Sequence, residues 1–164
     1  MSGRRTGSPY LEVCIPELEG WDYEVTSDFD FGYNCIAYTA GDEERIWWPL
    51  DDESVYWPVG APFECTVNAF VRAYELIGYG RCEDDSFDAG YDKIALYLGE
   101  DGNPRHAALQ VDGLYWKSKL GRLHDIKHPL RALEGSTYGH PTVFLRRPRL
   151  ADRRARPFER LTGW

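Results

Sequence analysis

Apolar residues recur at helical spacing in one stretch of the chain, residues 63–77. Pro62 precedes this stretch and Gly78 follows it, and both residue types are common at helix boundaries. The pattern predicts a helix with one face turned toward the core. The apolar positions of that face are Val67, Phe70, Val71, Tyr74 and Ile77.

From residue 92 onward, the apolar period changes from three or four residues to two. Residues 92–98 and 105–111 are separated by the turn sequence GEDGNP. Asp112 and Gly113, a common pair in tight hairpins, then lead into residues 114–121. This pattern predicts an antiparallel sheet of three consecutive strands. A short segment around HDIKHPLRALEG follows, and PTVFLRR is typical of a last strand.

A short helix is predicted just after Tyr33. Asn34 is a good helix cap, Cys35 would be the first helical residue, and Gly41 can end the helix in a left-handed conformation. The acidic, aromatic segment before it, residues 16–33, indicates irregular structure. The stretch IWWPLDDESVYWPVGAP after it contains too many prolines for a helix or a central strand. The predicted fold class is therefore α+β.

Composition limits both the organisation and the function. The chain has 164 residues, of which 43% are hydrophobic, which suits one packed domain. We expect a single domain over residues 1–150 and a basic tail over residues 151–164. The net charge of -8 argues against nucleic-acid binding, because an acidic surface repels phosphate.

No run of about 18 or more apolar residues occurs, so no membrane span is expected. The first residues, MSGRRTGSPYLEV, lack the apolar stretch of a signal peptide. We expect a cytoplasmic protein, or one exported without a signal peptide. The four cysteines lie far apart without a CxxC motif, which favours free thiols.

Two residues are candidates for nucleophilic chemistry. A thiol attacks as its thiolate, which the first turn of a helix favours, and Cys35 has that position. A cysteine hydrolase also needs a base, and His106 opens the middle predicted strand. The alternatives are a buried structural cysteine and a solvated histidine. A second pair, His124 and His128, would share a helix face and suggests zinc, but Pro129 argues against a helix there.

The order of cysteine-bearing helix, second helix, strand and histidine-bearing strand resembles the compact bacterial papain-like fold of NlpC-type and CHAP-type peptidases and amidases. The similarity covers roughly residues 30–120. The chain also resembles a group of uncharacterised bacterial proteins with four short motifs. These motifs stand here as Asn34 to Ala37, His106 to Ala108, Trp116 to Gly121, and Asp125 to His128.

The papain-like resemblance implies a fold in which the cysteine helix and a second helix pack on an antiparallel sheet. It makes Cys35 the nucleophile and His106 the base, with a third residue that orients the imidazole. Ser118 suits that role by spacing, and Asp125 suits it by charge. The resemblance implies no cofactor and no metal.

Four further residues are candidates for substrate binding. Tyr33 or Asn34 would complete an oxyanion hole with the N–H of Cys35, although Asn34 also suits a helix cap. Trp48, with its neighbouring tryptophans, would line a groove or else cover the end of the core. Lys119 would bind a substrate carboxylate or else be a surface charge.

Two functions follow as expectations. The first is a papain-like thiol hydrolase or acyltransferase, which acts on an amide, peptide or thioester bond of a peptide or protein substrate; a bacterial toxin or effector domain would fit this description. The second is a non-catalytic interaction module on the same fold, such as an immunity or adaptor protein, which binds a partner protein.

Overall fold

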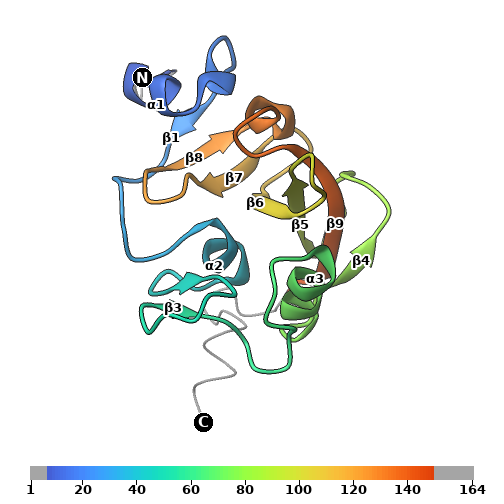
Figure 1. The fold of residues 1–164 in the computed structure, drawn as a ribbon. Helices are drawn as coiled ribbons and strands as arrows, with labels where there is room; N and C mark the ends of the chain where they lie inside the picture. The colour runs from blue at the N-terminus through green and yellow to red at the C-terminus, as the bar shows by residue number, and fades with distance from the viewer. Residues whose placement is uncertain (1–6, 150–164) are drawn as a thin grey trace.

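Seven strands form one antiparallel sheet at the centre of the protein, in the order β1-β8-β7-β6-β5-β9-β4 (Figure 1). The computed structural model describes residues 7–149, so the predicted basic tail, residues 151–164, lies outside the described residues. The strands of this sheet are β1 (Glu24–Val25), β4 (Gly80–Cys82), β5 (Tyr91–Leu98), β6 (Pro104–Gln110), β7 (Trp116–Lys119), β8 (Asp125–His128) and β9 (His140–Pro148).

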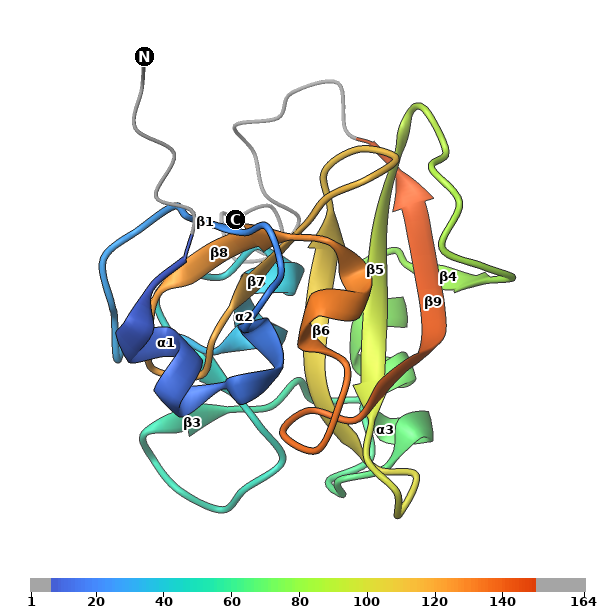
Figure 2. The same ribbon diagram turned by 90° about the horizontal axis from the view of Figure 1, so that it is seen from above.

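Helices cover both faces of this sheet, and a second sheet of two short parallel strands lies beside α2 (Figures 1 and 2). Figure 2 shows α1 and the orange 3-10 helix η2 on the near side, with α2 and α3 behind the sheet. These remaining elements are α1 (Pro9–Cys14), η1 (Pro16–Leu18), α2 (Cys35–Ala40), β2 (Ile46–Trp47), β3 (Val55–Tyr56), α3 (Val67–Glu75) and η2 (Leu130–Leu133).

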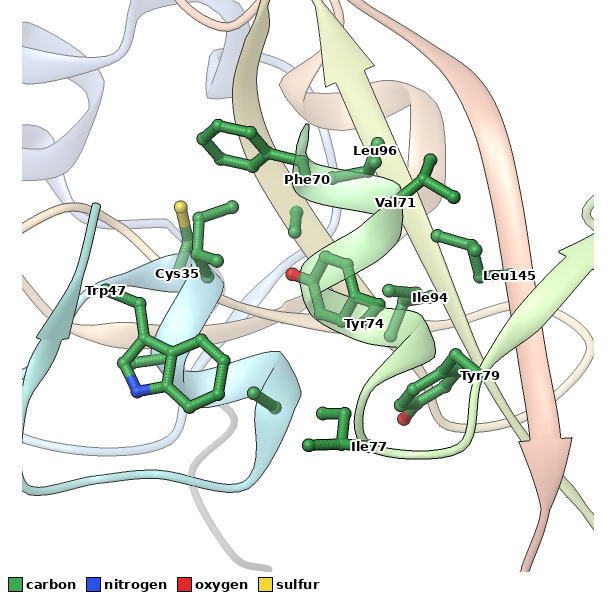
Figure 3. Packing of buried hydrophobic residues seen from close by; sticks show 14 of the residues in the cluster. Cys35, Trp47, Phe70, Val71, Tyr74, Ile77, Tyr79, Ile94, Leu96 and Leu145 are labelled. Atoms are coloured by element: carbon green, nitrogen blue, oxygen red, sulfur yellow. The ribbon is translucent and has the colours of Figure 1, made fainter. Parts of the chain in front are cut away.

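The alternation of side chains along the strands divides the core into two clusters. The first cluster lies between the sheet and the helices α2 and α3, and it includes Leu96 and Ala107 (Figure 3). The second lies between the sheet and α1, η1 and η2, and it includes Tyr97 and Ala108. Successive residues of β5 and β6 thus belong to opposite clusters, so both faces of these two strands are buried.

The predicted helices form where the apolar pattern places them. Helix α2 begins at Cys35 and ends at Gly41, which has φ of 90° in the left-handed region. Helix α3 begins later than residue 63, because the side chain of Thr66 accepts a hydrogen bond from the N–H of Ala69 and caps the helix there. The α+β class is confirmed.

The three consecutive strands of the predicted sheet are also confirmed, as β5, β6 and β7. The sequence did not predict the edge strands β1 and β4, and the first of them lies in the segment expected to be irregular. Two further features of the sheet were not predicted. The segment HDIKH contains β8, which pairs with β7, and the last strand, β9, lies between β5 and β4 rather than at an edge. Over residues 7–149, no helix is long and apolar enough to cross a membrane.

Candidate functional site

Cys35 begins α2, and the side chain of Asn34 fixes the backbone around it. The Oδ1 atom of Asn34 accepts hydrogen bonds from the N–H groups of Ala37 and Trp47, both at 3.1 Å. Its Nδ2 atom donates to the carbonyl of Trp47 at 2.9 Å. Asn34 therefore caps α2 and joins it to β2. Because its amide is committed to Trp47, the expectation that Asn34 serves an oxyanion hole is replaced by a structural role.

The thiol of Cys35 is buried, with 6% of the residue exposed. Burial raises the pKa of Cys35 to about 11, and the backbone N–H groups of Ala107, Ile36 and Cys35 itself oppose this rise. Buried thiols favour the protonated form, because a low-dielectric environment penalises the anion. In this structure Cys35 is thus a neutral thiol at pH 7.

The contact with the N–H of Ala107 shows that the thiol lies at the seam between β6 and β7. Val111 donates its N–H to the carbonyl of Tyr115, on the β7 side of β6. Every second residue of an antiparallel strand points the same way, so the N–H of Ala107 also faces that side. The pairing of β6 with β7 is limited to residues 109–110 of β6. The Cys35 sulfur therefore lies beside the place where β7 separates from β6.

His106 precedes Ala107 on β6 and is fully buried. Its Nε2 atom lies 2.9 Å from the Oγ of Ser118. Its ring stacks on that of Tyr138, with centroids 4.1 Å apart, and meets the ring of Tyr97 edge-on at 5.1 Å. Burial lowers the pKa of His106 well below 6.5, with a smaller effect from His128. His106 is therefore a neutral imidazole fixed between two aromatic rings.

Ser118 joins His106 to a second histidine. The Oγ of Ser118 lies 2.7 Å from Nε2 of His128, and Nδ1 of His128 lies 2.7 Å from the carbonyl oxygen of Pro129. Ser118 and His128 are both fully buried. The four groups form one line of hydrogen bonds across β6, β7 and β8, on the face of the sheet that η2 covers.

The register of the sheet explains why Ser118 reaches His106. Leu109 pairs with Lys117 across β6 and β7, so continuing the register places Ser118 opposite Ala108. Residues two apart on a strand share a face, and diagonal neighbours across strands are within reach of long side chains. Of the two residues that the sequence offered as partners of His106, the structure selects Ser118.

Asp125 has a different partner. Its carboxylate accepts hydrogen bonds from the hydroxyl of Tyr33, at 3.2 and 3.0 Å. It lies opposite Lys119 in the β7–β8 pair, one residue out of phase with Ser118, so it points to the other face of the sheet. The prediction that Asp125 orients His106 is therefore wrong, as is a role for the Tyr33 hydroxyl as a free donor.

Lys119 is completely buried, so the prediction of a surface charge is wrong. Its ammonium donates three hydrogen bonds to the carbonyls of Asp30, Gly121 and Leu123, at 2.6, 3.0 and 2.5 Å. It also lies 4.9 Å from the centre of the Tyr33 ring. Because three carbonyls use its three N–H groups, Lys119 holds the segment at Asp30 against the turn between β7 and β8 and is not available to a substrate carboxylate.

Trp48 packs on the core, as one of the two sequence alternatives proposed. Its ring meets that of Phe70 edge-on at 5.1 Å, and the ring of Trp57 lies 4.9 Å from the same phenylalanine. The indole N–H of Trp57 donates to the carbonyl of Pro62. The tryptophan-rich stretch thus covers α3 rather than lining a groove.

Across the described part of the chain, the Nδ1 atom of His106 has no hydrogen-bond partner, although it is buried. The thiol of Cys35 and this imidazole are therefore not hydrogen-bonded to one another. The two side chains lie on opposite faces of β6, which explains why they make no hydrogen bond. Cys35 packs with Ala107 in the cluster beneath α2, and the His106 ring projects to the other face.

Sequence reasoning missed the parts played by His128 and Tyr138. His128 was examined as a possible helical zinc ligand, but a period of two along DIKH places Ile126 and His128 on the buried face of a strand. Tyr138 lies between two glycines in the loop before β9, where no periodic pattern of apolar residues indicates that its side chain is buried. His128 uses both ring nitrogens in hydrogen bonds. Among residues 7–149, no three His, Cys, Asp or Glu side chains gather as metal ligands would.

Comparison with known proteins gives one match. A family model described as a domain of unknown function (DUF7689) matches residues 24–146. This range extends from the start of β1 into β9, and it contains Cys35, His106, Ser118 and His128. No curated protein and no solved structure matches the chain.

Proposed function

The chain belongs to the DUF7689 family, and we propose that it is a papain-like thiol hydrolase or acyltransferase acting on an amide, peptide or thioester bond. Cys35 is the proposed nucleophile and His106 the proposed base. The observation that carries the proposal is the state of His106: Ser118 engages its Nε2 atom, and its Nδ1 atom is left without a partner.

The surroundings of the thiol support the same assignment. One of the three backbone N–H groups that face the Cys35 sulfur belongs to Ala107, the residue directly after His106. The thiol thus lies against the backbone next to His106, while the His106 ring lies on the opposite face of β6. Catalytic hydrogen bonds are often long or misaligned without substrate and tighten when it binds. The proposed reaction therefore requires that substrate binding bring the thiol and Nδ1 together at the seam where β7 separates from β6.

The proposed reaction conserves every proton. Nδ1 of His106 takes the proton of the Cys35 thiol while the sulfur bonds to the substrate carbonyl carbon, and the carbonyl oxygen becomes an oxyanion. The N–H of Cys35 stabilises that oxyanion. The bond to the leaving group then breaks, and Nδ1 returns the proton to it. Water or an acceptor amine next attacks the thioester with Nδ1 as base, which releases the product and restores the thiol.

The test combines covalent labelling with turnover. Incubation with acyl thioesters and peptide amides should yield a mass increase on the Cys35 peptide, equal to the acyl group. Cys35→Ala should abolish turnover, and His106→Gln should reduce kcat by about 10²–10⁴-fold. Cys65→Ala is the matched control, because Cys65 is a half-buried thiol whose sulfur instead faces the carbonyl of Pro104. Turnover that survives Cys35→Ala would refute the proposal.

A non-catalytic interaction module is the second candidate, favoured by the deep burial and raised pKa of the Cys35 thiol. In that case Cys35 and His106 stabilise the core, and the function lies in binding a partner protein. Cys35→Ala would then leave partner binding intact, and no substrate would produce an acyl adduct on Cys35.

A further inference from the structure

The hydrogen bonds around Ser118 have a definite direction. The carbonyl oxygen of Pro129 can only accept, so Nδ1 of His128 is the donor in that bond. Burial lowers the pKa of His128 to about 4, so the ring is neutral at pH 7 and its Nε2 carries a lone pair. Nε2 therefore accepts the hydroxyl proton of Ser118.

The same logic fixes His106. Ser118 has one hydroxyl proton, and it is used in the bond to His128. The Oγ atom can then only accept from His106, so Nε2 of His106 carries the ring proton. A neutral imidazole has one N–H, so Nδ1 of His106 is left with a free lone pair. This Nδ1 is among the buried side-chain atoms that have no hydrogen-bond partner in the described part of the chain.

We infer that His128 is a positioning residue that acts through Ser118 to keep His106 in the tautomer with the proton on Nε2 and the lone pair on Nδ1. The inference rests on the proposed function for its catalytic meaning, because Nδ1 is the proposed base. The tautomer itself is a property of the resting protein and is measurable without any substrate.

This arrangement explains how an uncharged serine can serve as the third residue, which orients the imidazole of His106 in the proposed site. A serine alone can either donate to or accept from an imidazole, so it selects neither tautomer. Donation to His128 removes the first option and leaves Ser118 as an acceptor only. Hydrogen bonds in such chains also polarise one another, which strengthens the acceptor oxygen toward Nε2–H of His106.

The test is the pattern of ring ¹⁵N shifts and long-range ¹H–¹⁵N couplings of the histidines at pH 7. The wild-type protein should show protonated Nε2 and unprotonated Nδ1 for His106, and the reverse for His128. His128→Phe should move a substantial fraction of His106 to the Nδ1–H tautomer, because Ser118 is then free to donate. Where a substrate is turned over, kcat should fall at least about tenfold, because the base is then protonated in the wrong place.

Two variants complete the design. His128→Gln, whose side-chain oxygen can still accept from Ser118, should preserve the His106 tautomer. His124→Phe is the matched control: His124 packs against Phe29 outside the chain of hydrogen bonds, so the His106 signals should not change. The inference is overturned if His106 of the wild-type protein is protonated on Nδ1. It is also overturned if His128→Phe folds and its His106 keeps the wild-type tautomer. Because the spectra require no substrate, that result is distinct from a failure of Cys35→Ala to abolish turnover.

Discussion

At the scale of single residues, Lys119 shows how a buried charge is stabilised without a close carboxylate. Its ammonium is satisfied by three backbone carbonyls, one of them from Asp30, which is 89 residues earlier in the chain. Burial lowers the pKa of Lys119, and the charges of Asp125 and Asp30 oppose this effect. The residue thus links the segment before α2 to the turn after β7.

Lys119→Met should lower the free energy of unfolding by about 3 kcal/mol, because three backbone carbonyls would lose a charged donor from a buried side chain. Urea denaturation followed by tryptophan fluorescence measures this change. Lys117→Met is the matched control, on the same strand and the same face but only half-buried. The control should lie within about 0.5 kcal/mol of the wild type. Equal losses in both variants would contradict the assigned role of Lys119.

At the scale of elements, α2 is a helix of six residues that depends on its surroundings. So short a helix is not stable in isolation. Asn34 caps it and also binds both backbone groups of Trp47, so that the first turn of α2 and the strand β2 form one unit. This unit, together with the strands beneath it, is what buries the thiol of Cys35.

Asn34→Ala should destabilise the protein more than Asn34→Asp does, because aspartate keeps the acceptor of the cap and loses only the N–H that donates to Trp47. Loss of a helix cap costs about 0.5–2 kcal/mol. As α2 loosens, alkylation of Cys35 should become faster in the same order. Peptide mass spectrometry reads this rate, with the exposed Cys14 as internal reference. If Asn34→Ala left Cys35 as protected as before, the cap would not control access to the thiol.

At the scale of the whole molecule, the sheet separates two chemical environments. One face carries the neutral chain of His106, Ser118 and His128, and the other carries the ionisable side chains of Lys119 and Asp125, which lie opposite each other on β7 and β8. Cys35 lies at the seam where β6 and β7 part. A site built this way depends on both halves of the core at once.

The buried histidines make the stability of the molecule depend on pH. Above about pH 6.5 both imidazoles are neutral in the folded and unfolded states, and their contribution to stability is complete. As the pH falls, the unfolded state binds protons that the folded state excludes, down to the pKa of about 4 for His128. The free energy of unfolding should therefore fall by about 1.4 kcal/mol per pH unit for each of His106 and His128.

Urea denaturation at several pH values between 6.5 and 5 checks this slope. His128→Gln should remove one histidine's share of it. If the stability of the wild-type protein did not change with pH over this interval, His106 and His128 would be protonated in the folded protein as readily as in the unfolded chain.

The sequence by itself determined the local elements. Helix α2, its cap and its terminating glycine follow from residues 34–41, and the hairpin of β6 and β7 follows from Asp112 and Gly113. The loop of that hairpin has three residues, 112–114, and not the two of a tight Asp-Gly turn, because the N–H of Val111 donates to the carbonyl of Tyr115. The longer loop puts Ser118 on the same face as His106, whereas a two-residue turn would place Ser118 opposite Ala107. These features depend on neighbours within about a dozen residues, where pattern and turn chemistry decide the conformation.

Only the tertiary structure decided which residues lie together at the candidate site. His128 reaches Ser118 because β8 pairs with β7, and β9 enters the sheet between β5 and β4. Lys119 and Asp125 make structural contacts with Asp30 and Tyr33, which come from a distant part of the chain. Whether a polar group faces solvent, a substrate or a buried acceptor is set by long-range pairing and burial. Neither quantity can be read from residue type and spacing alone.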